Sequence, residues 1–434
     1  MDNIKKFNEF KNGLSGEIII PPDKSISHRS LIFGALTNSK IQIKNLSLGL
    51  DCLATLKILE NLGIKHEFSN ERDLILDSSQ GFSQPNCSLD CQNSGTSTRL
   101  LAGLFSWQNF NCKLVGDKSL SKRPMKRIIE PLEKMGAKIV SNENKLPLEI
   151  KGTKLNSIEY FSPIPSAQVK SCIILAGLGA NGKTKIYENT LSRNHSEIML
   201  EYLEAKINTG KDEKGFFVEI EKSELKPKDI EVVGDISSAA FFMVAGAIIP
   251  NSSILIKNVG INPTRTGILD VFEQAQIDFK LLNQRKITNE LCADILINYT
   301  ENIKPFTIQG DIIPRLIDEI PILAVLASQA NGTSIIKDAK DLRNKESDRI
   351  KTIVDTFKKL NVEIEEKEDG FIIQGKNNLN KEVELETHLD HRLAMSYFIL
   401  SMLNKQQTSI QGIDCINTSF PEFMKLMQEL GYGK

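Results

Sequence analysis

Six segments of the chain share one pattern, in which a short polar loop precedes a helix-length apolar run rich in Ala, Gly and Leu. The six are residues 25–36, 93–105, 165–178, 234–248, 315–327 and 389–400. Their starts are 70, 69, 69, 81 and 74 positions apart, measured at Arg29, Arg99, Gln168, Ser237, Asp318 and Arg392. Such regular spacing indicates one supersecondary unit that is used six times.

Between these segments the polarity pattern changes to that of strands and surface helices. Short β-branched runs bounded by turns, such as 16–20 and 41–43, predict strands. Amphipathic helices are predicted at 51–62, 124–136, 196–206, 265–276 and 348–360. Because a helix that is apolar on all sides belongs inside a domain, we predict an α/β fold with buried helices and outer sheets. Three units in each half of the chain would make two similar domains.

The helix starts carry more basic residues than capping explains. The first N–H groups of a helix lack internal partners and the macrodipole is positive there, so anions bind. Ser, Thr, Asp or Asn at any one start is sufficiently explained as an N-cap. Capping does not explain the cations at or near these starts, which predict convergent anion binding; they are Lys24, Arg29, Arg99, Arg315, Arg349 and Arg392. The start at 235–237 has no cation of its own in the sequence, so we expect it to act mainly as a cap and hinge.

Composition narrows the class of protein. A length of 434 residues favours two domains, and a formal net charge of −1 provides no positive field for nucleic acid. No apolar run approaches a membrane span, and the N-terminal segment has the features of neither a signal nor a transit peptide. Seven scattered cysteines predict reduced thiols in the cytoplasm. Cys87 and Cys91 have no second ligand pair at zinc spacing, so no metal is expected.

Arginine is much rarer than lysine in this chain, and most arginines lie in a few segments. The 54 basic residues comprise 42 Lys and 12 Arg, and nine of the arginines fall in the motif segments described below. This distribution indicates sites where a planar guanidinium is needed to hold carboxylate or phosphate. Arg123 precedes a helix start at Pro124, where an anion would again be bound. Gly95 either allows close backbone approach to a ligand or serves as a turn glycine.

The densest cluster of charge covers residues 342–349. Lys345 and Arg349 are expected one helical turn apart, where two cations repel each other unless an anion lies between them. Asp318 begins another apolar helix, and a buried carboxylate requires a partner. Asp318 and Glu346 are therefore the candidate proton-transfer groups.

Other familiar catalytic patterns do not occur in the context that their chemistry requires. The residues GLGANGKT (177–184) match the letters of the P-loop pattern, but they follow the apolar helix-length segment 165–178 and not a strand. The sequence contains no strand-linked dinucleotide fingerprint and no nucleophile elbow. ATP-dependent, dinucleotide-dependent and Ser–His–Asp chemistry are therefore not expected. His28, His195 and His391 are placed in polar loops without metal-ligand spacing, and hydrogen bonding is their expected role.

Ten segments, in order along the chain, resemble the signatures of the 5-enolpyruvylshikimate-3-phosphate synthase family. They are DKSISHR (23–29), NSGTSTR (93–99), KRPM (122–125), PSAQVKS (165–171), SRNHSE (192–197), GDISSAAFF (234–242), PTRTG (263–267), PRLIDEIP (314–321), LRNKESDR (342–349) and LDHRLAM (389–395). The resemblance implies the inside-out α/β barrel fold of enolpyruvyl transferases. One domain would span 21–233, and the other would comprise 1–20 and 234–434. It also implies that the chain crosses twice between the domains and that the active site lies in a cleft that closes on substrates.

The resemblance further implies transfer of the enolpyruvyl group of phosphoenolpyruvate to the 5-hydroxyl of shikimate 3-phosphate, with release of phosphate. This addition–elimination passes through a tetrahedral intermediate and belongs to aromatic amino acid biosynthesis. The resemblance implies no cofactor. We expect a cytoplasmic monomer that binds neither nucleic acid nor membrane.

Site residues are also carried over from the resemblance. Asp318 would accept the hydroxyl proton, while Glu346 and Lys24 are the candidates for proton delivery and return. The residues placed near shikimate 3-phosphate are Ser25, Arg29, Asp318, Ser166, Ser192 and Lys345. Those placed around phosphoenolpyruvate are Lys24, Gly95, Arg123, Gln168, Arg349 and Arg392.

Three positions depart from one well-known branch of the family. Ala167 stands where that branch has a second serine, His195 where it has tyrosine, and Thr418 where it has a substrate-binding lysine. All three agree with the other bacterial branch, which has SAQVK and TSFP-like segments.

Two other functions are considered. The related enolpyruvyl transferase that acts on UDP-N-acetylglucosamine carries a reactive cysteine at the position of Lys118 and an asparagine at that of Ser25. A non-catalytic or nucleic-acid-binding relative of the repeat would have no reason to keep Asp318, Glu346 and the arginines together. Both alternatives are therefore disfavoured.

Overall fold

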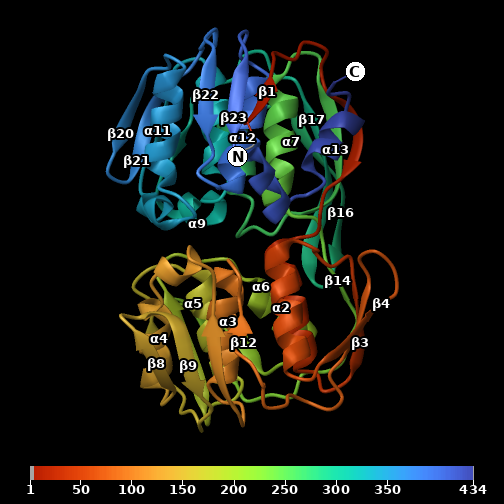
Figure 1. Ribbon diagram of the computed structural model, residues 1–434, viewed down its shortest axis with the longest axis vertical. Helices are drawn as coiled ribbons and strands as arrows, with labels where there is room; N and C mark the ends of the chain where they lie inside the picture. Colours follow the sequence, from red (N-terminus) through yellow and green to blue (C-terminus); the bar gives the residue numbers. More distant parts are fainter. Residues whose placement is uncertain (1–3, 434) are drawn as a thin grey trace. The chain divides into compact units, whose positions relative to one another are not determined.

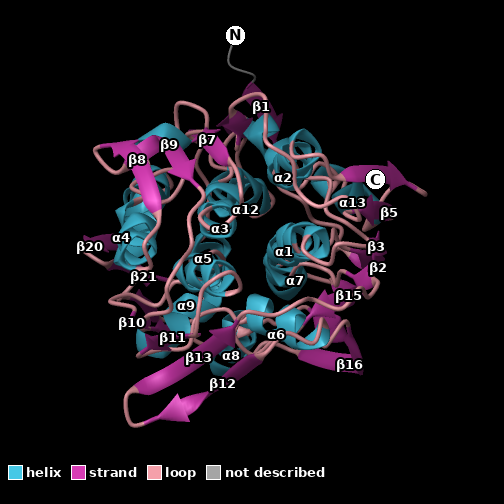
Figure 2. Cartoon of the chain, turned by 90° about the horizontal axis from the view of Figure 1, so that it is seen from below, coloured by secondary structure: helices cyan, strands magenta, loops and turns pink. Residues whose placement is uncertain are grey.

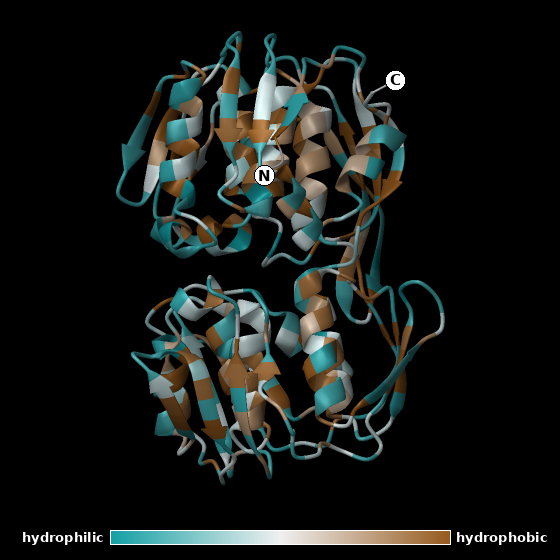
Figure 3. Cartoon of the chain, viewed as in Figure 1, coloured by the Kyte–Doolittle hydropathy of each residue, from teal (hydrophilic) through white to brown (hydrophobic). Residues whose placement is uncertain are grey.

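The computed structural model describes residues 4–433, and each of the six apolar segments forms a helix in it. These helices are α1 (Lys24–Ala35), α3 (Gly95–Phe105), α5 (Ala167–Gly177), α7 (Ile236–Ile248), α10 (Ile320–Gln329) and α12 (His391–Ser401). In five of them an Asp or Ser side chain accepts a hydrogen bond from an N–H group of the first turn. Most side chains of these helices are buried on every side, as predicted. Figure 3 shows that α7 is apolar along nearly its whole length.

The described residues divide into two units. Unit 1 comprises 4–21, 234–285 and 291–433, and unit 2 comprises 22–233 and 286–290. The chain thus passes between the units four times and not twice. The two additional passages arise because residues 286–290, at the turn between β16 (Phe279–Ile287) and β17 (Glu290–Asn298), belong to unit 2.

Unit 2 contains three four-stranded sheets of one design, in which the first pair of strands is parallel and the other pairs are antiparallel. The first sheet has the order β14 (Ile230–Glu231), β3 (Lys40–Lys44), β5 (Leu74–Asp77), β4 (Lys65–Phe68). The second is β6 (Leu89–Asp90), β7 (Asn111–Val115), β9 (Lys145–Lys151), β8 (Lys138–Asn142). The third is β10 (Glu159–Phe161), β11 (Lys183–Glu188), β13 (Gly215–Glu221), β12 (Ile207–Asp212).

Unit 1 also contains three sheets. The first has the order β16, β17, β15 (Ser253–Gly260), β2 (Ser15–Ile19), and the second is β18 (Thr307–Ile308), β19 (Thr333–Ile336), β21 (Gly370–Gln374), β20 (Ile364–Lys367). The third has three strands within the described residues, namely β1 (Ile4–Phe7), β23 (Thr408–Gln411) and β22 (Val383–Glu386). Strands distant in sequence complete sheets in both units, since β14 pairs with β3, β2 with β15, and β1 with β23.

The remaining helices flank the buried ones. They are α2 (Leu50–Asn61), α4 (Lys126–Lys134), α6 (His195–Tyr202), α8 (Gly267–Ala275), α9 (Ile313–Leu316), α11 (Arg349–Lys359) and α13 (Phe423–Glu429). Short 3-10 turns cover Leu120–Lys122, Gly310–Ile312, Lys340–Asn344 and Ile413–Thr418. All five predicted amphipathic helices are confirmed. Two of them begin two residues later than predicted, at Lys126 and Gly267.

The buried helices of unit 2 lie inside its sheets, as Figures 1 and 2 show for α3 and α5. These two helices approach so closely that a Cβ atom at Gly103 would lie 2.0 Å from the carbonyl oxygen of Cys172. Only glycine permits this contact between helix backbones. Close packing of the apolar helices brings their polar N-terminal ends together within the unit, and these ends form the site described next.

Candidate functional site

In unit 2, the start of α1 is held by a buried arginine. Arg29 donates from Nε to Ser196 Oγ at 2.7 Å, from Nη2 to Ser171 Oγ at 2.7 Å and from Nη1 to the Ser25 carbonyl oxygen at 2.9 Å. Burial lowers the pKa of Arg29 to about 10 against the opposing attraction of Glu197, so the guanidinium remains charged at neutral pH. Arg29 thereby joins α1 to α5 and α6.

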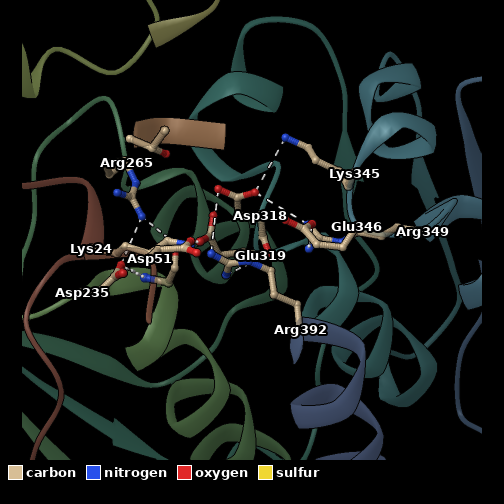
Figure 4. A network of polar contacts seen from close by, with 12 residues as sticks. Lys24, Asp51, Asp235, Arg265, Asp318, Glu319, Lys345, Glu346, Arg349 and Arg392 are labelled. Atoms are coloured by element: carbon tan, nitrogen blue, oxygen red, sulfur yellow. Dashed lines mark hydrogen bonds and ion pairs between the residues drawn. The ribbon is translucent and has the colours of Figure 1, made fainter. Parts of the chain in front are cut away.

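Lys24, the first residue of α1, forms an ion pair with a residue that the sequence did not single out. Its Nζ lies 2.9 Å from Asp51 Oδ2, and both side chains are partly buried (Figure 4). In the sequence Asp51 has the ordinary appearance of an acidic residue in the first turn of a helix. Only the pairing of α1 with α2 shows that it faces Lys24.

The starts of α3 and α5 meet through an arginine and a glutamine. Arg99 Nη1 donates to Gln168 Oε1 at 2.5 Å, and Gln168 Nε2 donates to Thr96 Oγ1 at 3.0 Å. A Cβ atom on Gly95 would lie 2.8 Å from Arg99 Nη1 and 3.6 Å from Arg123 Nη1. Gly95 therefore leaves open the space in front of two guanidinium groups, which favours the first of its two predicted roles, close approach to a ligand.

Arg123 and the two candidate serines complete this group in unit 2. Arg123 follows the 3-10 turn Leu120–Lys122 and donates from Nη2 to Asn93 Oδ1 at 2.9 Å. Ser166 caps α5 by accepting from Val169 N at 3.5 Å. Ser192 donates to Glu188 Oε1 at 2.6 Å. Unit 2 therefore brings together Lys24, Ser25, Arg29, Gly95, Arg123, Ser166, Gln168 and Ser192 at or near the ends of its buried helices.

In unit 1, three cations surround one carboxylate (Figure 4). Asp318 Oδ1 lies 3.9 Å from Lys345 Nζ and 3.7 Å from Arg349 Nη1, and Asp318 Oδ2 lies 4.0 Å from Arg392 Nη2. These distances correspond to electrostatic contacts rather than close hydrogen bonds. Arg392 Nη1 also donates to the Asp318 carbonyl oxygen at 3.3 Å.

Arg349 is fixed by two further carboxylates. Its Nη2 lies 2.7 Å from Glu346 Oε2, and its Nε lies 2.8 Å from Asp390 Oδ2. Burial would lower the pKa of Arg349, but attraction to Asp390 and Glu346 outweighs it and raises the pKa. Asp390 also accepts from Arg392 N at 3.0 Å as the N-cap of α12. One buried carboxylate thus positions both Arg349 and Arg392.

Two features of unit 1 differ from the sequence prediction. Lys345 and Arg349 do not share a helix, because Lys345 is extended (φ −83°, ψ −154°) and α11 begins at Arg349. Their common neighbour Asp318, rather than helical spacing, brings the two cations together. The start of α7 was expected to lack a cation, yet Arg265 Nη2 lies 3.2 Å from Asp235 Oδ1 and donates to Ser237 Oγ at 2.6 Å. The capping role of Asp235 is confirmed by its bond from Ser237 N.

The three histidines are not in loops. His195 and His391 are the first residues of α6 and α12, and His28 lies within α1. All three are buried, and His195 Nδ1 lies 2.7 Å from Glu290 Oε1. His28 Nδ1 lies 2.8 Å from Thr55 Oγ1, while its Nε2 is buried without a hydrogen-bond partner among residues 4–433. Hydrogen bonding is therefore confirmed as a role of His28 and His195.

His28 predicts a component of acid sensitivity. Burial lowers its pKa to about 3, against an ordinary value of 6.5. Between these values the unfolded chain binds the additional proton, so this stabilisation is complete above the unfolded pKa and is lost as the pH falls. From pH 7 to pH 5, we expect His28 to account for about 2 kcal/mol of lost stability.

The measurement is urea unfolding of the protein and of His28→Gln at both pH values. The loss of stability between pH 7 and pH 5 should be smaller in His28→Gln by the stated amount. His66→Gln, on the partly exposed strand β4, is the control and should keep the full pH dependence. An unchanged pH dependence in His28→Gln would contradict the assignment.

Neither a metal cluster nor a membrane span is found in the described part of the chain. No three His, Cys, Asp or Glu side chains within 4–433 are grouped to hold a metal ion. No helix over the same residues is long and apolar enough to cross a membrane. All seven cysteines are free thiols.

Comparison with known proteins shows the family. The sequence model of EPSP synthase (3-phosphoshikimate 1-carboxyvinyltransferase) matches residues 9–427. A 3-phosphoshikimate 1-carboxyvinyltransferase of Citrifermentans bemidjiense is 45% identical over 419 residues, covering 95% of this chain and 96% of that protein. The same-named protein of Bacillus cytotoxicus is 43% identical over 434 residues, covering 99% and 100%.

Comparison with solved structures supports the same family. The EPSP synthase of Acinetobacter baumannii has a TM-score of 0.88 at 36% identity and covers 99% of this chain and 98% of its own. The enolpyruvyl transferase NikO of Streptomyces tendae has a TM-score of 0.78 with the same coverage, but at 13% identity it supports the fold alone. The enolpyruvyl transferase fold expected from the sequence is thereby confirmed, and the chain belongs to the EPSP synthase family.

Proposed function

We propose that this protein transfers the enolpyruvyl group of phosphoenolpyruvate to the 5-hydroxyl of shikimate 3-phosphate and releases phosphate. The family match over residues 9–427 is the observation that carries this proposal. The geometry of each unit supports it, because both substrates are multiply anionic and each unit gathers cations at helix starts. The active site would form from the two groups of residues together, in a cleft between domains at 21–233 and at 1–20 plus 234–434.

The reaction requires an addition followed by an elimination. In the addition, the 5-hydroxyl oxygen bonds to the central carbon of phosphoenolpyruvate, its proton leaves, and the methylene carbon gains a proton to become methyl. In the elimination, the methyl group loses a proton, the double bond reforms and the phosphate leaves. The protein must therefore accept one proton, deliver and recover another, and stabilise the departing anion.

The described contacts support roles for the titratable groups. Asp318 is assigned to accept the hydroxyl proton, and its carboxylate lies 3.9, 3.7 and 4.0 Å from three cations that would also attract the anionic substrates. Glu346 and Lys24 remain the two candidates for proton delivery and return. Each is partly exposed and has a partner of opposite charge, Arg349 for Glu346 and Asp51 for Lys24.

The substrate contacts are proposed in the same way. Ser25, Arg29, Ser166, Ser192, Asp318 and Lys345 would contact shikimate 3-phosphate. Lys24, Gly95, Arg123, Gln168, Arg349 and Arg392 would hold phosphoenolpyruvate. We further propose that the protein is a cytoplasmic monomer, that it requires no metal or cofactor, and that it binds neither nucleic acid nor membrane. Light scattering would test the oligomeric state.

A two-substrate assay tests the function. Phosphate should be released only when shikimate 3-phosphate and phosphoenolpyruvate are both present. Each substrate alone, and phosphoenolpyruvate with UDP-N-acetylglucosamine, are the controls. Turnover with UDP-N-acetylglucosamine in place of shikimate 3-phosphate would overturn the proposal and favour the related sugar-nucleotide enzyme.

Arg123 provides a test of the phosphoenolpyruvate site. Lysine keeps the charge but loses the planar fork that binds an anion through two parallel hydrogen bonds. We expect Arg123→Lys to raise KM for phosphoenolpyruvate by about 10-fold, measured by steady-state kinetics. Arg127→Lys is the matched control, because Arg127 lies four positions further on, in α4. An unchanged KM in Arg123→Lys would remove Arg123 from the site.

A further inference from the structure

A buried lysine lies behind the candidate phosphate-binding serines of unit 2. Lys170, in α5, has a side-chain exposure of 1%. Its Nζ lies 2.8 Å from Glu188 Oε2, 2.8 Å from Glu197 Oε1 and 3.2 Å from the Ser192 carbonyl oxygen. Burial alone would lower the pKa of Lys170, but attraction to Glu197 and Glu188 outweighs it and raises the pKa. The ammonium group is therefore charged and fully coordinated inside the unit.

Glu188 connects this lysine to both serines. It is the last residue of β11, and its Oε1 accepts from Ser192 Oγ at 2.6 Å and from Ser166 N at 3.3 Å. Its Oε2 accepts from Ser192 N at 3.3 Å and from Lys170. One carboxylate thus receives hydrogen bonds from the loop that precedes α5 and from the loop that precedes α6. This arrangement sets the distance between Ser166 and Ser192.

The charges in this part of unit 2 are balanced. Glu197, in α6, is buried against Lys170, and its negative charge also raises the pKa of Arg29 in opposition to the effect of burial. Arg29 in turn donates to Ser196, the neighbour of Glu197. Two cations and two carboxylates therefore offset one another, which a buried set of charges requires.

The direction of the Ser192 hydroxyl has a chemical consequence. A hydroxyl has a single proton, and that of Ser192 is donated to Glu188. To bind a phosphate oxygen, Ser192 must turn this proton away from Glu188. Glu188 then loses one hydrogen bond but keeps those from Lys170, Ser192 N and Ser166 N. Lys170 makes the reorientation possible because it keeps the buried carboxylate paired.

We propose that Lys170, Glu188 and Glu197 are positioning residues that hold Ser166 and Ser192 ready for the phosphate group of shikimate 3-phosphate. This inference rests on the proposed placement of that phosphate at the two serines. The three residues would not touch the substrate, and they would act through the serine loops. Their contribution should therefore appear in the affinity for shikimate 3-phosphate and not in the affinity for phosphoenolpyruvate.

The test replaces Lys170 together with Glu188, so that the remaining buried carboxylate, Glu197, is balanced only by the nearby charge of Arg29. Lys170→Met alone leaves two buried carboxylates facing each other, and it is expected to lower stability. The double variant Lys170→Met/Glu188→Leu replaces the pair with apolar groups and should recover much of that stability. We expect its KM for shikimate 3-phosphate to rise about 10-fold or more, while KM for phosphoenolpyruvate changes less than about 2-fold.

A matched control is available on the same sheet. Lys183, also in β11, lies between Glu219 and Glu221 at 3.3 Å and 3.0 Å, but on the surface. Lys183→Met/Glu221→Leu therefore repeats the same chemical change away from the serines, and it should leave both KM values unchanged. If the folded Lys170→Met/Glu188→Leu protein also keeps a normal KM for shikimate 3-phosphate, the positioning role is wrong.

Serine variants separate this inference from the placement on which it rests. Ser166→Ala and Ser192→Ala should each raise KM for shikimate 3-phosphate. If neither does, the phosphate is not bound there, and both the placement and the positioning role are overturned. If the serine variants raise KM but Lys170→Met/Glu188→Leu does not, only the positioning role fails.

Discussion

Replacing Asp318 with asparagine is expected to lower kcat by about 10²–10⁴-fold, the range typical for loss of a general base. Asparagine keeps the size of the side chain but cannot accept the hydroxyl proton. The three cations around Asp318 would then lack this counter-charge. Because they would attract anionic substrates at least as strongly, neither KM should rise. A low kcat with unchanged or lower KM values would distinguish lost proton transfer from a disordered site.

Asp341 supplies the control for this experiment. Its Oδ2 lies 3.3 Å from Lys345 Nζ, so it shares a cation with Asp318, but its side chain is more exposed, at 44% against 18%. Asp341→Asn should leave kcat within about 3-fold of the original value, since exposed ion pairs contribute little. If Asp318→Asn retained a similar rate, Asp318 would not be the base.

Glu346→Gln is the second substitution with a large expected effect, a decrease in kcat of about 10²-fold or more. Glutamine can still accept the hydrogen bond from Arg349 Nη2, and Asp390 holds the same guanidinium independently. Arg349 should therefore stay in place, and the free energy of unfolding should change by less than about 1 kcal/mol. A rise in KM for phosphoenolpyruvate without a fall in kcat would instead mean that Glu346 only orients Arg349.

The same variant can decide between the two candidates for proton delivery. In the addition step the methylene carbon gains a proton and becomes methyl. In heavy water this proton is a deuteron, so the enolpyruvyl group should keep deuterium after the methyl group loses a proton and the double bond reforms. We expect either Glu346→Gln or Lys24→Met to abolish this incorporation, and mass spectrometry would measure it. Glu366→Gln is the control, because Glu366 also pairs with an arginine, Arg343 at 2.9 Å. A near-normal rate in Glu346→Gln would remove Glu346 from the mechanism.

Prediction from the sequence succeeded where the information is local. The apolar segments became buried helices because their side chains leave no polar face for solvent. Asp23, Ser94, Ser166, Asp235 and Asp390 cap these helices because a cap acts over two or three residues. The same locality explains why Lys345 and Arg349 were wrongly placed on one helix. Their short separation suggested helical spacing, but the chain between them is not helical.

Prediction failed where partners are distant in the chain. Lys24 pairs with Asp51 over 27 positions, Lys170 with Glu188 over 18, and Arg349 with Asp390 over 41. Within its own segment, the carboxylate of each pair has no sequence feature that indicates its partner. Asp390, for example, was contained in a recognised motif, yet nothing in that motif indicates that it anchors Arg349. Arg265 was missed as the cation at the start of α7 for the same reason, since it lies 30 positions from Asp235.

From the amino-acid sequence alone we could predict the sixfold repeat, the buried helices, the family resemblance and most of the cations near the helix starts. These properties follow from periodicity and from residue types within short segments. The fold was needed to show which carboxylate faces each cation and which distant strand completes each sheet, as β14 does beside β3. Buried charges must be paired wherever packing places them. Packing depends on contacts between segments that no local pattern records.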